Sequence, residues 1–490
     1  MKAVIIGSGI GGMASAIRMA AMGFETHVFE QNSFYGGKIN SKSIKGYRFD
    51  RGPSVFTEPH LVDELLSLND PSKNNFTYTK LPISCCYFFQ DGTRIALPTG
   101  CGAVAKSLSD ELGEDRRDIE KLLKRLELNY KAVYAVFIQA SLHRLKQWLN
   151  RSIINAIYRI PFYGLFSSMN SVNSKSFKNP KTTQIFNRFA TYNGSDPYRS
   201  PGMFNIIAHL ELNIGPFMPK GGMVSISDAI YKKAIDLGIR FHFESRVDEI
   251  LYSEGKVKGV VSAGQNQECD LVVSNMDVHF TYEKLLPKLE RPKKILNQEK
   301  STSAIVFYWG IRKSFDQLDV HNIFFSDDYQ GEFKSIFHNK TLSDDPTVYI
   351  HVSSKMEKED APEGCENWFV MVNAPIDNGQ DWHVQKEEVR ANIIRKLDKL
   401  LNEDVSRLIE VEEALDPVMM ERMYSGKNGS IYGNASNSVF SSFYRHPNYA
   451  PSLKGLYFSG VTVHPGGGIP LALNSAAIVQ KCVKADFSIH

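Results

Sequence analysis

The sequence predicts an α/β fold built around a Rossmann-type dinucleotide-binding domain. An apolar strand over residues 3–6 runs into a glycine-rich turn, GSGIGG, at residues 7–12. An alanine-rich helix follows, and a second strand ends on Glu30. Strand, turn, helix and acid occur in the order that a dinucleotide-binding unit requires, whereas a glycine motif alone would be weak evidence.

The glycines and the acid of this unit each have a physical role. Gly7 allows the tight turn, Gly9 lets the backbone approach a pyrophosphate, and Gly12 lets helix and strand pack closely. The start of the helix directs free N–H groups and a partial positive charge at that pyrophosphate. Glu30 stands where an acid accepts a hydrogen bond from the adenosine ribose and disfavours a 2′-phosphate.

The composition indicates a folded protein with several domains' worth of core. The chain has 490 residues, of which 42% are hydrophobic and 23% charged. A net charge of +3, without a basic run containing aromatic residues, argues against nucleic acid as a partner. The six cysteines show no metal-ligand spacing, so we expect no metal site and reduced thiols. We expect neither a signal peptide nor a spanning helix, and therefore a cytoplasmic protein.

Two further turns follow the first unit. The glycine pair at 36–37 permits close backbone approach, and Lys38 is expected to meet a phosphate or the polar edge of the cofactor. The segment GYRFDRGPSV at residues 46–55 contains a Gly-Pro turn that is expected to pass near the reactive ring. Asp50, in this segment, is interpreted as a carboxylate that fixes the turn rather than as a base.

Residues 61–112 predict a short helix at 61–68, strands at 85–89 and 94–97, and a helix from Val104. Asp91 and Gly92 form a hairpin signal between the two strands. Here the chain is expected to leave the cofactor domain for a substrate-facing sheet.

Residues 115–170 predict helices with an unusual surface. Apolar and aromatic residues at 130–138 are followed by basic residues among apolar ones, from Arg144 through Lys146 and Trp148 to Arg159. Basic and aromatic residues around an apolar face suit a helix in a membrane interface. We expect a helical lid in peripheral contact with the cytoplasmic membrane. The alternative is a lid packed on the protein's own core.

The remaining chain returns twice to the cofactor. Gly221 and Gly222 open a helix predicted at 224–237, and alternating strands follow at 239–275. Strands and an amphipathic helix at 388–401 come next, and the chain ends with a strand, a glycine-rich turn and a helix at 455–479. We therefore predict a discontinuous cofactor domain of residues 1–75, 219–290 and 426–490. A mixed-sheet substrate domain takes residues 76–218, including the lid, and 291–425.

These segments resemble the flavin-containing amine oxidase superfamily, and more closely the bacterial phytoene desaturase-type carotenoid desaturases. The motifs are the GxGxxG start, the GG-basic turn, the GxxFDxGP segment, PKGGM at 219–223 and HPGGGIP at 464–470. The likeness runs from Met1 to about Ala485. Most members of the family carry an arginine where this chain has Lys38. The lysine keeps the positive charge but lacks the planar guanidinium group with its paired N–H donors. Val461 replaces an acid that many related flavoproteins carry, so ribitol contacts would come from the backbone.

The resemblance implies FAD as the cofactor. The residues it implies as contacts are Gly7, Gly9, Ile10, Gly11, Gly12, Glu30, Gln31, Gly37, Lys38, Pro53, Ser54, Val55, Val247, Asn275, Gly460, Gly467, Gly468, Ile469 and Pro470.

One stretch narrows the resemblance further. FNRFATYNGSDPY at 186–198 is similar to the 1-hydroxycarotenoid 3,4-desaturases, which implies a carotenoid substrate and substrate contacts from Arg188 and Tyr192. The alternative is an aromatic-rich structural turn.

The implied reaction removes a hydride and a proton from two allylic carbons. The flavin accepts the hydride, while the protein orients the substrate and excludes water. The proton-accepting residue is not identified. His464 is a candidate, with a structural histidine as the alternative. Oxygen or a quinone-like acceptor would reoxidise the flavin.

Other functions compete with this one. A phytoene desaturase, a carotene isomerase and an amine oxidase are alternatives among enzymes, and the HPGGG ending argues against the amine oxidase. A non-enzymatic prenyl-protein escort of the GDP-dissociation-inhibitor type uses this fold without flavin. Glu30, Lys38 and the C-terminal glycines argue against that escort.

Overall fold

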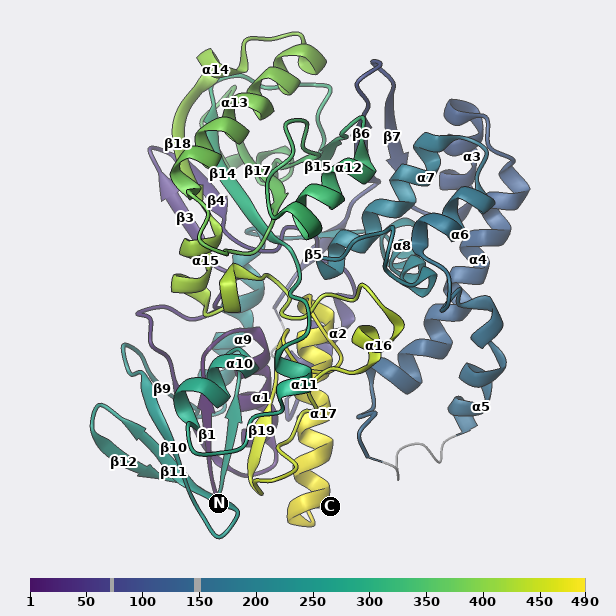
Figure 1. Cartoon of the computed structure of the whole chain (residues 1–490). Helices are drawn as coiled ribbons and strands as arrows, with labels where there is room; N and C mark the ends of the chain where they lie inside the picture. Colours follow the sequence, from purple (N-terminus) through teal and green to yellow (C-terminus); the bar gives the residue numbers. More distant parts are fainter. Residues whose placement is uncertain (71–74, 145–150, 490) are drawn as a thin grey trace.

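A five-stranded parallel sheet forms the base of the molecule. The computed structural model describes residues 1–70, 75–144 and 151–489. The sheet has the order β19-β13-β1-β2-β9, and every pairing in it is parallel. Its strands are β1 (Lys2–Ile6), β2 (Glu25–Phe29), β9 (Arg240–His242), β13 (Leu271–Ser274) and β19 (Leu456–Phe458). Three distant parts of the chain therefore meet in one sheet, next to both termini (Figure 1).

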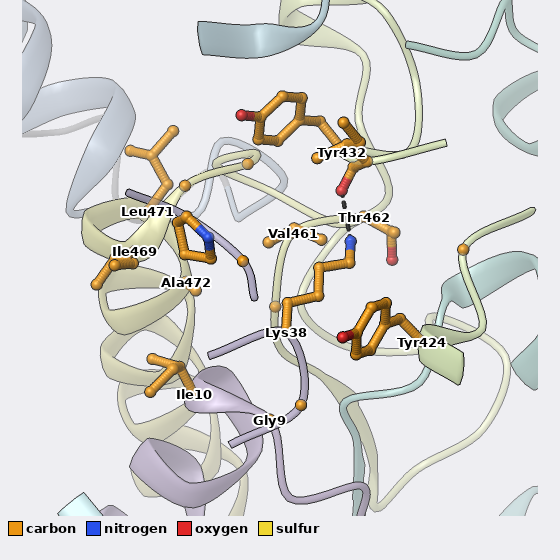
Figure 2. A pocket seen from close by; sticks show the side chains of 18 of the residues that line it. Gly9, Ile10, Lys38, Tyr424, Tyr432, Val461, Thr462, Ile469, Leu471 and Ala472 are labelled. Atoms are coloured by element: carbon orange, nitrogen blue, oxygen red, sulfur yellow. Dashed lines mark hydrogen bonds between the residues drawn. The ribbon is translucent and has the colours of Figure 1, made fainter. Parts of the chain in front are cut away.

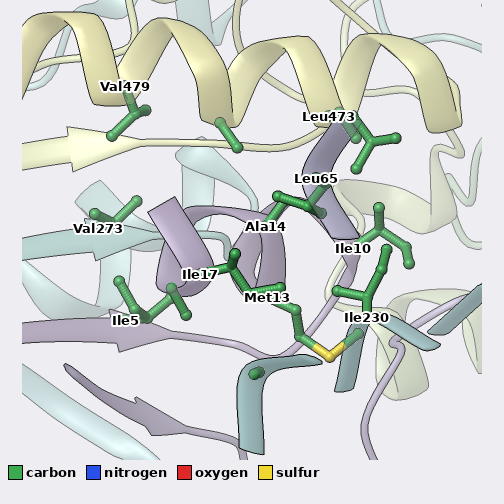
Figure 3. Packing of buried hydrophobic residues seen from close by; sticks show 14 of the residues in the cluster. Ile5, Ile10, Met13, Ala14, Ile17, Leu65, Ile230, Val273, Leu473 and Val479 are labelled. Atoms are coloured by element: carbon green, nitrogen blue, oxygen red, sulfur yellow. The ribbon is translucent and has the colours of Figure 1, made fainter. Parts of the chain in front are cut away.

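Helices α1 (Ile10–Ala21), α9 (Val224–Asp236) and α17 (Ile469–Phe487) supply the core beside this sheet. Figure 3 shows Ile5 of β1, Val273 of β13 and Ala14 of α1 in one cluster, with α17 running above it. A Cβ on Gly12 would collide with the carbonyl oxygen of Gly7. Close packing of α1 on the sheet therefore requires glycine at this position.

A seven-stranded, mostly antiparallel sheet forms the second lobe. Its order is β18-β14-β17-β16-β15-β6-β7, and β15 and β6 pair in parallel. One face is covered by α13 (Trp382–Leu401), whose Val389, Ile393 and Leu397 are buried against Trp309 and Trp368. The strands are β6 (Ile83–Phe88), β7 (Arg94–Pro98), β14 (Ser303–Ile311), β15 (His321–Phe324), β16 (Val348–His351), β17 (Glu366–Ala374) and β18 (Ile409–Leu415).

Helices gather on the right of Figure 1 as a third lobe. Its α-helices are α3 (Cys101–Leu112), α4 (Arg116–Val133), α5 (Arg151–Tyr158), α6 (Met169–Ser176), α7 (Pro180–Asn187) and α8 (Ile206–Ala208). It also contains the 3₁₀ helices η4 (Ile160–Phe162), η5 (Arg188–Asn193) and η6 (Gly202–Asn205) and the π-helices η2 (Tyr134–Ile138) and η7 (His209–Ile214).

The expected lid falls in this helical lobe, although Lys146 and Trp148 lie outside the described residues. Within residues 1–70, 75–144 and 151–489, every helix lacks the combination of length and apolar composition that crossing a bilayer requires. The side chains of Ile154, Ile157, Tyr158 and Phe166 are exposed. Contact of this lobe with a membrane stays a prediction.

Smaller elements make up the rest of the secondary structure in the described residues. The strands are β3 (Ser41–Ile44), β4 (Tyr47–Asp50), β5 (Tyr78–Lys80), β8 (Phe217–Pro219), β10 (Val247–Ser253), β11 (Lys256–Ser262) and β12 (Gln265–Glu268). The helices are α2 (His60–Leu66), α10 (Val278–Phe280), α11 (Lys293–Leu296), α12 (Tyr329–Lys334), α14 (Val405–Leu408), α15 (Pro417–Tyr424) and α16 (Val439–Phe443). The π-helices η8 (Thr281–Leu285) and η9 (Ser335–Asn339) and the 3₁₀ helices η10 (Ser353–Lys355), η11 (Lys358–Asp360) and η12 (Lys427–Gly429) are also short.

The elements differ from the sequence expectations mainly at helix starts. The helix expected from residue 388 begins at Trp382, because the Asp381 side chain accepts hydrogen bonds from the N–H groups of His383 and Val384. The helix expected from Val104 begins at Cys101, behind Gly100 with φ 100°. The five-stranded sheet takes its strands from segments 1–75, 219–290 and 426–490. The domain boundaries themselves stay a prediction.

Candidate active site

A cavity of about 560 Å³ lies where the carboxyl ends of the five parallel strands face the second lobe. The residues after β1, β2, β13 and β19 line it, as expected for a ligand site in an open α/β sheet. Every predicted cofactor contact except Gly12 lines this cavity, and so do Arg188 and Tyr192. The structure therefore brings the predicted residues together from the whole length of the chain.

Glycines shape the first end of the cavity. A Cβ on Gly9 would lie 2.7 Å from Asn275 Oδ1, and one on Gly11 would lie 3.0 Å from the Cα of Gly460. The Asn275 amide donates to the carbonyl oxygen of Ser459 at 2.9 Å and so joins the two glycine turns. Gly9 caps α1 without a side-chain hydrogen bond from any described residue, which leaves backbone N–H groups for an anion.

Glu30 lies on the cavity wall and is only 6% exposed. Its Oε2 accepts from the N–H and the hydroxyl of Ser8, both at 2.8 Å. Its Oε1 accepts from the backbone and the side chain of Asn32, both at 2.9 Å. Because a carboxylate offers about four acceptor sites, a ribose hydroxyl has to replace one of the two side-chain donors.

Lys38 is a partly buried cation at this end. Figure 2 shows its side chain extending from the Gly9 side of the cavity toward Tyr432, beside Tyr424. Its Nζ donates to the carbonyl oxygen of Ile431 at 2.7 Å. Burial lowers the pKa of Lys38 to about 8, and the nearby charge of Asp277 acts in the opposite direction.

The C-terminal glycine turn forms the next part of the wall. Helix α17 begins at Ile469 behind Gly468, and within the described chain no side chain caps it. A Cβ on Gly467 would collide with the ring of Tyr432. A Cβ added to Gly466 would lie 3.4 Å from the Cζ and Nε atoms of Arg445. This turn therefore packs directly on a guanidinium group.

Asp50 and His464 have structural partners and do not line the cavity. Asp50 accepts from the N–H groups of Met223 and Val224 at 2.9 and 3.2 Å, and so holds the start of α9. The His464 Nε2 atom lies 2.9 Å from the carbonyl oxygen of Ala140. Burial lowers the pKa of His464 to about 3, so the imidazole is neutral at pH 7. These contacts support the structural interpretation of both residues.

The other half of the cavity is mainly apolar. Its walls come from the helical lobe, from α15, and from the face of the seven-stranded sheet opposite α13. The apolar lining residues are Phe137, Ile138, Met203, Phe204, Ile206, Ile207, Leu210, Val306, Ile323, Phe369, Met371, Leu415, Met420 and Met423.

A buried polar cluster interrupts this apolar wall. Arg188 donates from Nε and Nη2 to the Tyr87 hydroxyl oxygen, at 2.9 and 2.7 Å, and forms an ion pair with Glu211. The hydroxyls of Tyr192 and Ser84 also donate to Glu211. Although burial opposes its charge, Glu211 raises the pKa of Arg188 well above its ordinary value. The cluster is a balanced ion pair.

One nitrogen of Arg188 remains available to a ligand. Within the described residues, its Nη1 donates to no side chain or carbonyl group, and the residue lines the cavity. The guanidinium carbon lies 4.5 Å from the ring centre of Phe189 and 5.3 Å from that of Tyr87, so the group is firmly held.

Sequence reasoning missed several residues of the site. Glu211 and Arg445 were assigned no role. Tyr349, on the sheet wall, shares hydrogen bonds of 2.8 Å with Ser54 and with His321 Nδ1. For Arg445, the one available sequence signal was its position as a basic residue shortly before the last strand. No sequence signal pointed to Glu211, because its role depends on its contact with Arg188.

Comparison with known proteins identifies the family. The family model described as "Flavin containing amine oxidoreductase" matches residues 10–479. The chain belongs to this family. It is 45% identical to the 1-hydroxycarotenoid 3,4-desaturase of a Flavobacterium species, over 98% of this chain and 99% of that protein. It is 30% identical to the 4,4′-diapolycopene oxygenase of a Methylomonas species, over 99% and 98%.

Solved structures show the same fold. Cyclohexylamine oxidase from Brevibacterium oxydans superimposes with a TM-score of 0.65 and 15% identity, covering 99% of each chain. The family uses a flavin, and the site described above fits one. The Gly9–Gly11–Gly460 cradle leaves no room for side chains beside Asn275, and two helix N-termini face the cavity.

Proposed function

We propose that this protein is an FAD-dependent carotenoid desaturase that forms the 3,4 double bond of a 1-hydroxylated carotenoid. The observation that carries the proposal is the 45% identity, over nearly the full length of both chains, to an enzyme with that name. A cavity that joins a dinucleotide end to an apolar end supports it physically.

The cofactor end suits FAD. The Gly9 turn and the start of α1 would hold the pyrophosphate, and Glu30 would hold the adenosine ribose. Val247, Asn275 and the C-terminal glycine turn would hold the remaining parts of the cofactor. When bound, the flavin supplies a hydride acceptor.

The substrate end orients the polyene and excludes water. Two C–H bonds break. One carbon loses a hydride, which takes both electrons of its bond, and the neighbouring carbon loses a proton, whose bonding electron pair forms the new C=C π bond. The apolar wall keeps water from the transient positive charge on the polyene. We assign no residue as the proton acceptor, and either oxygen or a quinone would take up the electrons.

Arg188 and Tyr192 are proposed to contact the oxygenated end of the substrate. The ion pair with Glu211 leaves the cluster neutral overall, so its free Nη1–H suits a neutral oxygen such as a hydroxyl. A protonated amine would face a guanidinium group instead. This chemistry supports an alcohol and argues against an amine as the substrate.

Peripheral contact with the cytoplasmic membrane is part of the proposal, because the substrate dissolves in lipid. Ile154, Tyr158 and Phe166 are 71%, 77% and 89% exposed in the helical lobe. Flotation with phosphatidylcholine–phosphatidylglycerol vesicles tests it. We expect Tyr158→Glu with Phe166→Glu to reduce flotation, while Val384→Glu, an exposed position on α13, leaves it unchanged.

The purified protein should be yellow, with a flavin spectrum and FAD released on denaturation. Incubation with 1-hydroxylated and unhydroxylated acyclic carotenoids tests the activity. A red shift of the polyene spectrum with the hydroxylated substrate is the expected result, because one double bond joins the conjugated chain. A colourless protein that takes up no FAD, or one that changes neither carotenoid, would contradict the proposal.

A further inference from the structure

Arg445 is a buried cation without a counter-ion among the described residues. It is 3% exposed and lines the cavity. Its Nη2 donates to the Asn434 carbonyl oxygen and the Ser436 hydroxyl, both at 3.1 Å, while its Nη1 is buried with no partner in residues 1–70, 75–144 and 151–489. In the part of the chain that the structure describes, Arg445 forms no ion pair with a carboxylate, and burial lowers its pKa to about 10. A buried, unpaired charge is unfavourable unless a ligand balances it.

The position of this charge is next to the C-terminal glycine turn. The Cζ and Nε atoms lie 3.4 Å from the place of a Cβ on Gly466, and the N-terminus of α17 follows at Ile469. A helix N-terminus carries a partial positive charge of its own. Two independent features therefore favour negative charge at the same part of the cavity wall.

The other buried arginine of the cavity does not have this property, because Arg188 pairs with Glu211. Lys38 forms no ion pair among the described residues either, but the residue is only partly buried and the charge of Asp277 acts to raise its pKa. The anion is also not expected to be the pyrophosphate, because the site predicted for that group lies at Gly9 and Gly11 of the other glycine turn. The group that remains is the redox-active ring of the cofactor.

We infer that Arg445 is the counter-ion of the reduced flavin, an inference that rests on the proposed function. The oxidised ring is neutral. A hydride brings two electrons and one proton, so the ring gains one net negative charge. Arg445 forms and breaks no covalent bond and transfers no proton; its charge makes the reduced form more favourable. The residue would thereby set the driving force for hydride removal from the substrate.

The test is the flavin midpoint potential of the substrate-free, FAD-loaded protein, together with its affinity for sulfite, which forms a negatively charged flavin adduct. We expect Arg445→Gln to lower the equilibrium constant for two-electron reduction roughly ten- to hundredfold. That change corresponds to about 30–60 mV. Sulfite affinity should fall by a similar factor, and Arg445→Lys should retain most of both properties.

The matched control is the neutral pair on the same cavity. The double variant Arg188→Met/Glu211→Gln removes a buried arginine together with its acid, so it should leave the potential nearly unchanged. Arg445→Met is the second neutral variant if Arg445→Gln does not fold. A merely structural Arg445 would change thermal stability without moving the potential.

The outcomes separate this inference from the proposed function. A flavin-loaded Arg445→Gln or Arg445→Met protein with the wild-type potential would overturn the counter-ion. An equal shift in the Arg188→Met/Glu211→Gln control would overturn it too. If the wild-type protein binds flavin but changes no carotenoid, the proposed function fails while the potential still decides the inference. If it binds no flavin, both fail.

Discussion

Arg188 and Arg445 line the same cavity, and both are buried, yet their electrostatic surroundings are opposite. Arg188 has a carboxylate on one side and aromatic rings around it, and it keeps one N–H for the cavity. Arg445 has a carbonyl oxygen and a hydroxyl as its hydrogen-bond partners, with no acid paired to it among the described residues.

The difference shows that charge balance, rather than residue type, decides what a buried arginine can bind. A balanced arginine offers a hydrogen bond to a neutral oxygen without attracting an anion strongly. An unbalanced arginine is stabilised by an anion and remains costly without one. The two ends of the cavity are therefore suited to different chemical groups, an alcohol at Arg188 and a reduced flavin at Arg445.

The largest effect is expected when the cofactor is excluded altogether. Gly9→Val should give a folded protein that contains almost no flavin, because the Cβ would lie 2.7 Å from Asn275 Oδ1 and the branches would fill the pyrophosphate position. The stabilisation that FAD gives to thermal unfolding should disappear with it. Gly102→Ala is the control, since a Cβ there meets no atom within 4 Å. Full flavin occupancy in Gly9→Val would refute the assignment of the first glycine turn.

The next largest effect is expected when the balanced arginine is made unbalanced. Glu211→Gln should lower the free energy of unfolding by about 3–5 kcal/mol, because it leaves Arg188 charged and unpaired in the interior. Denaturant titration of the flavin-loaded protein measures this change. Arg445→Gln, by contrast, breaks no ion pair and should cost less. Equal losses for the two variants would contradict the distinction between the two arginines.

The cofactor end could be predicted from the sequence because its requirements are local. Gly9 and Gly460 each occupy a position that has no room for a Cβ, so glycine alone fits there. The motifs around them have fixed spacing. Gly460, at φ 113°, also adopts a backbone conformation that other residues rarely take. The elements were predictable for the same reason, except at helix starts set by a cap such as Asp381.

The charge balance of the site could not be predicted in this way. Arg188 lies on η5 and Glu211 on η7, and their pairing depends on how irregular helical turns pack in three dimensions. Arg445 stands out because no acid is paired with it among the described residues, and the linear sequence does not show which side chains are neighbours in space. A residue-type pattern identifies an arginine, but only packing determines whether it is neutralised.

A smaller effect is expected on substrate choice. In Arg188→Met/Glu211→Gln the charge pair is removed together, so we expect it to recover at least half of the stability that Glu211→Gln loses. The preference for 1-hydroxylated over unhydroxylated carotenoid, measured as the ratio of kcat/KM values, should fall roughly tenfold, since one charge-assisted hydrogen bond is lost. Ile207→Val, on the apolar wall, should affect both substrates alike. An unchanged ratio would remove Arg188 from substrate recognition.

The smallest effect is expected at Tyr192, which donates a hydrogen bond to the Arg188–Glu211 ion pair but is not a member of it. Tyr192→Phe removes one donor to Glu211 but leaves Arg188 and Ser84 in place. The free energy of unfolding should fall by about 1–2 kcal/mol, with flavin content unchanged and the substrate ratio altered only about twofold. Ser84→Ala removes the other hydroxyl donor to the same carboxylate from outside the cavity lining, so it should match the stability loss without changing the ratio. If Tyr192→Phe changes the ratio as strongly as the Arg188 double variant, then Tyr192 contacts the substrate through its hydroxyl as well as its ring, and recognition does not depend on the free guanidinium N–H alone.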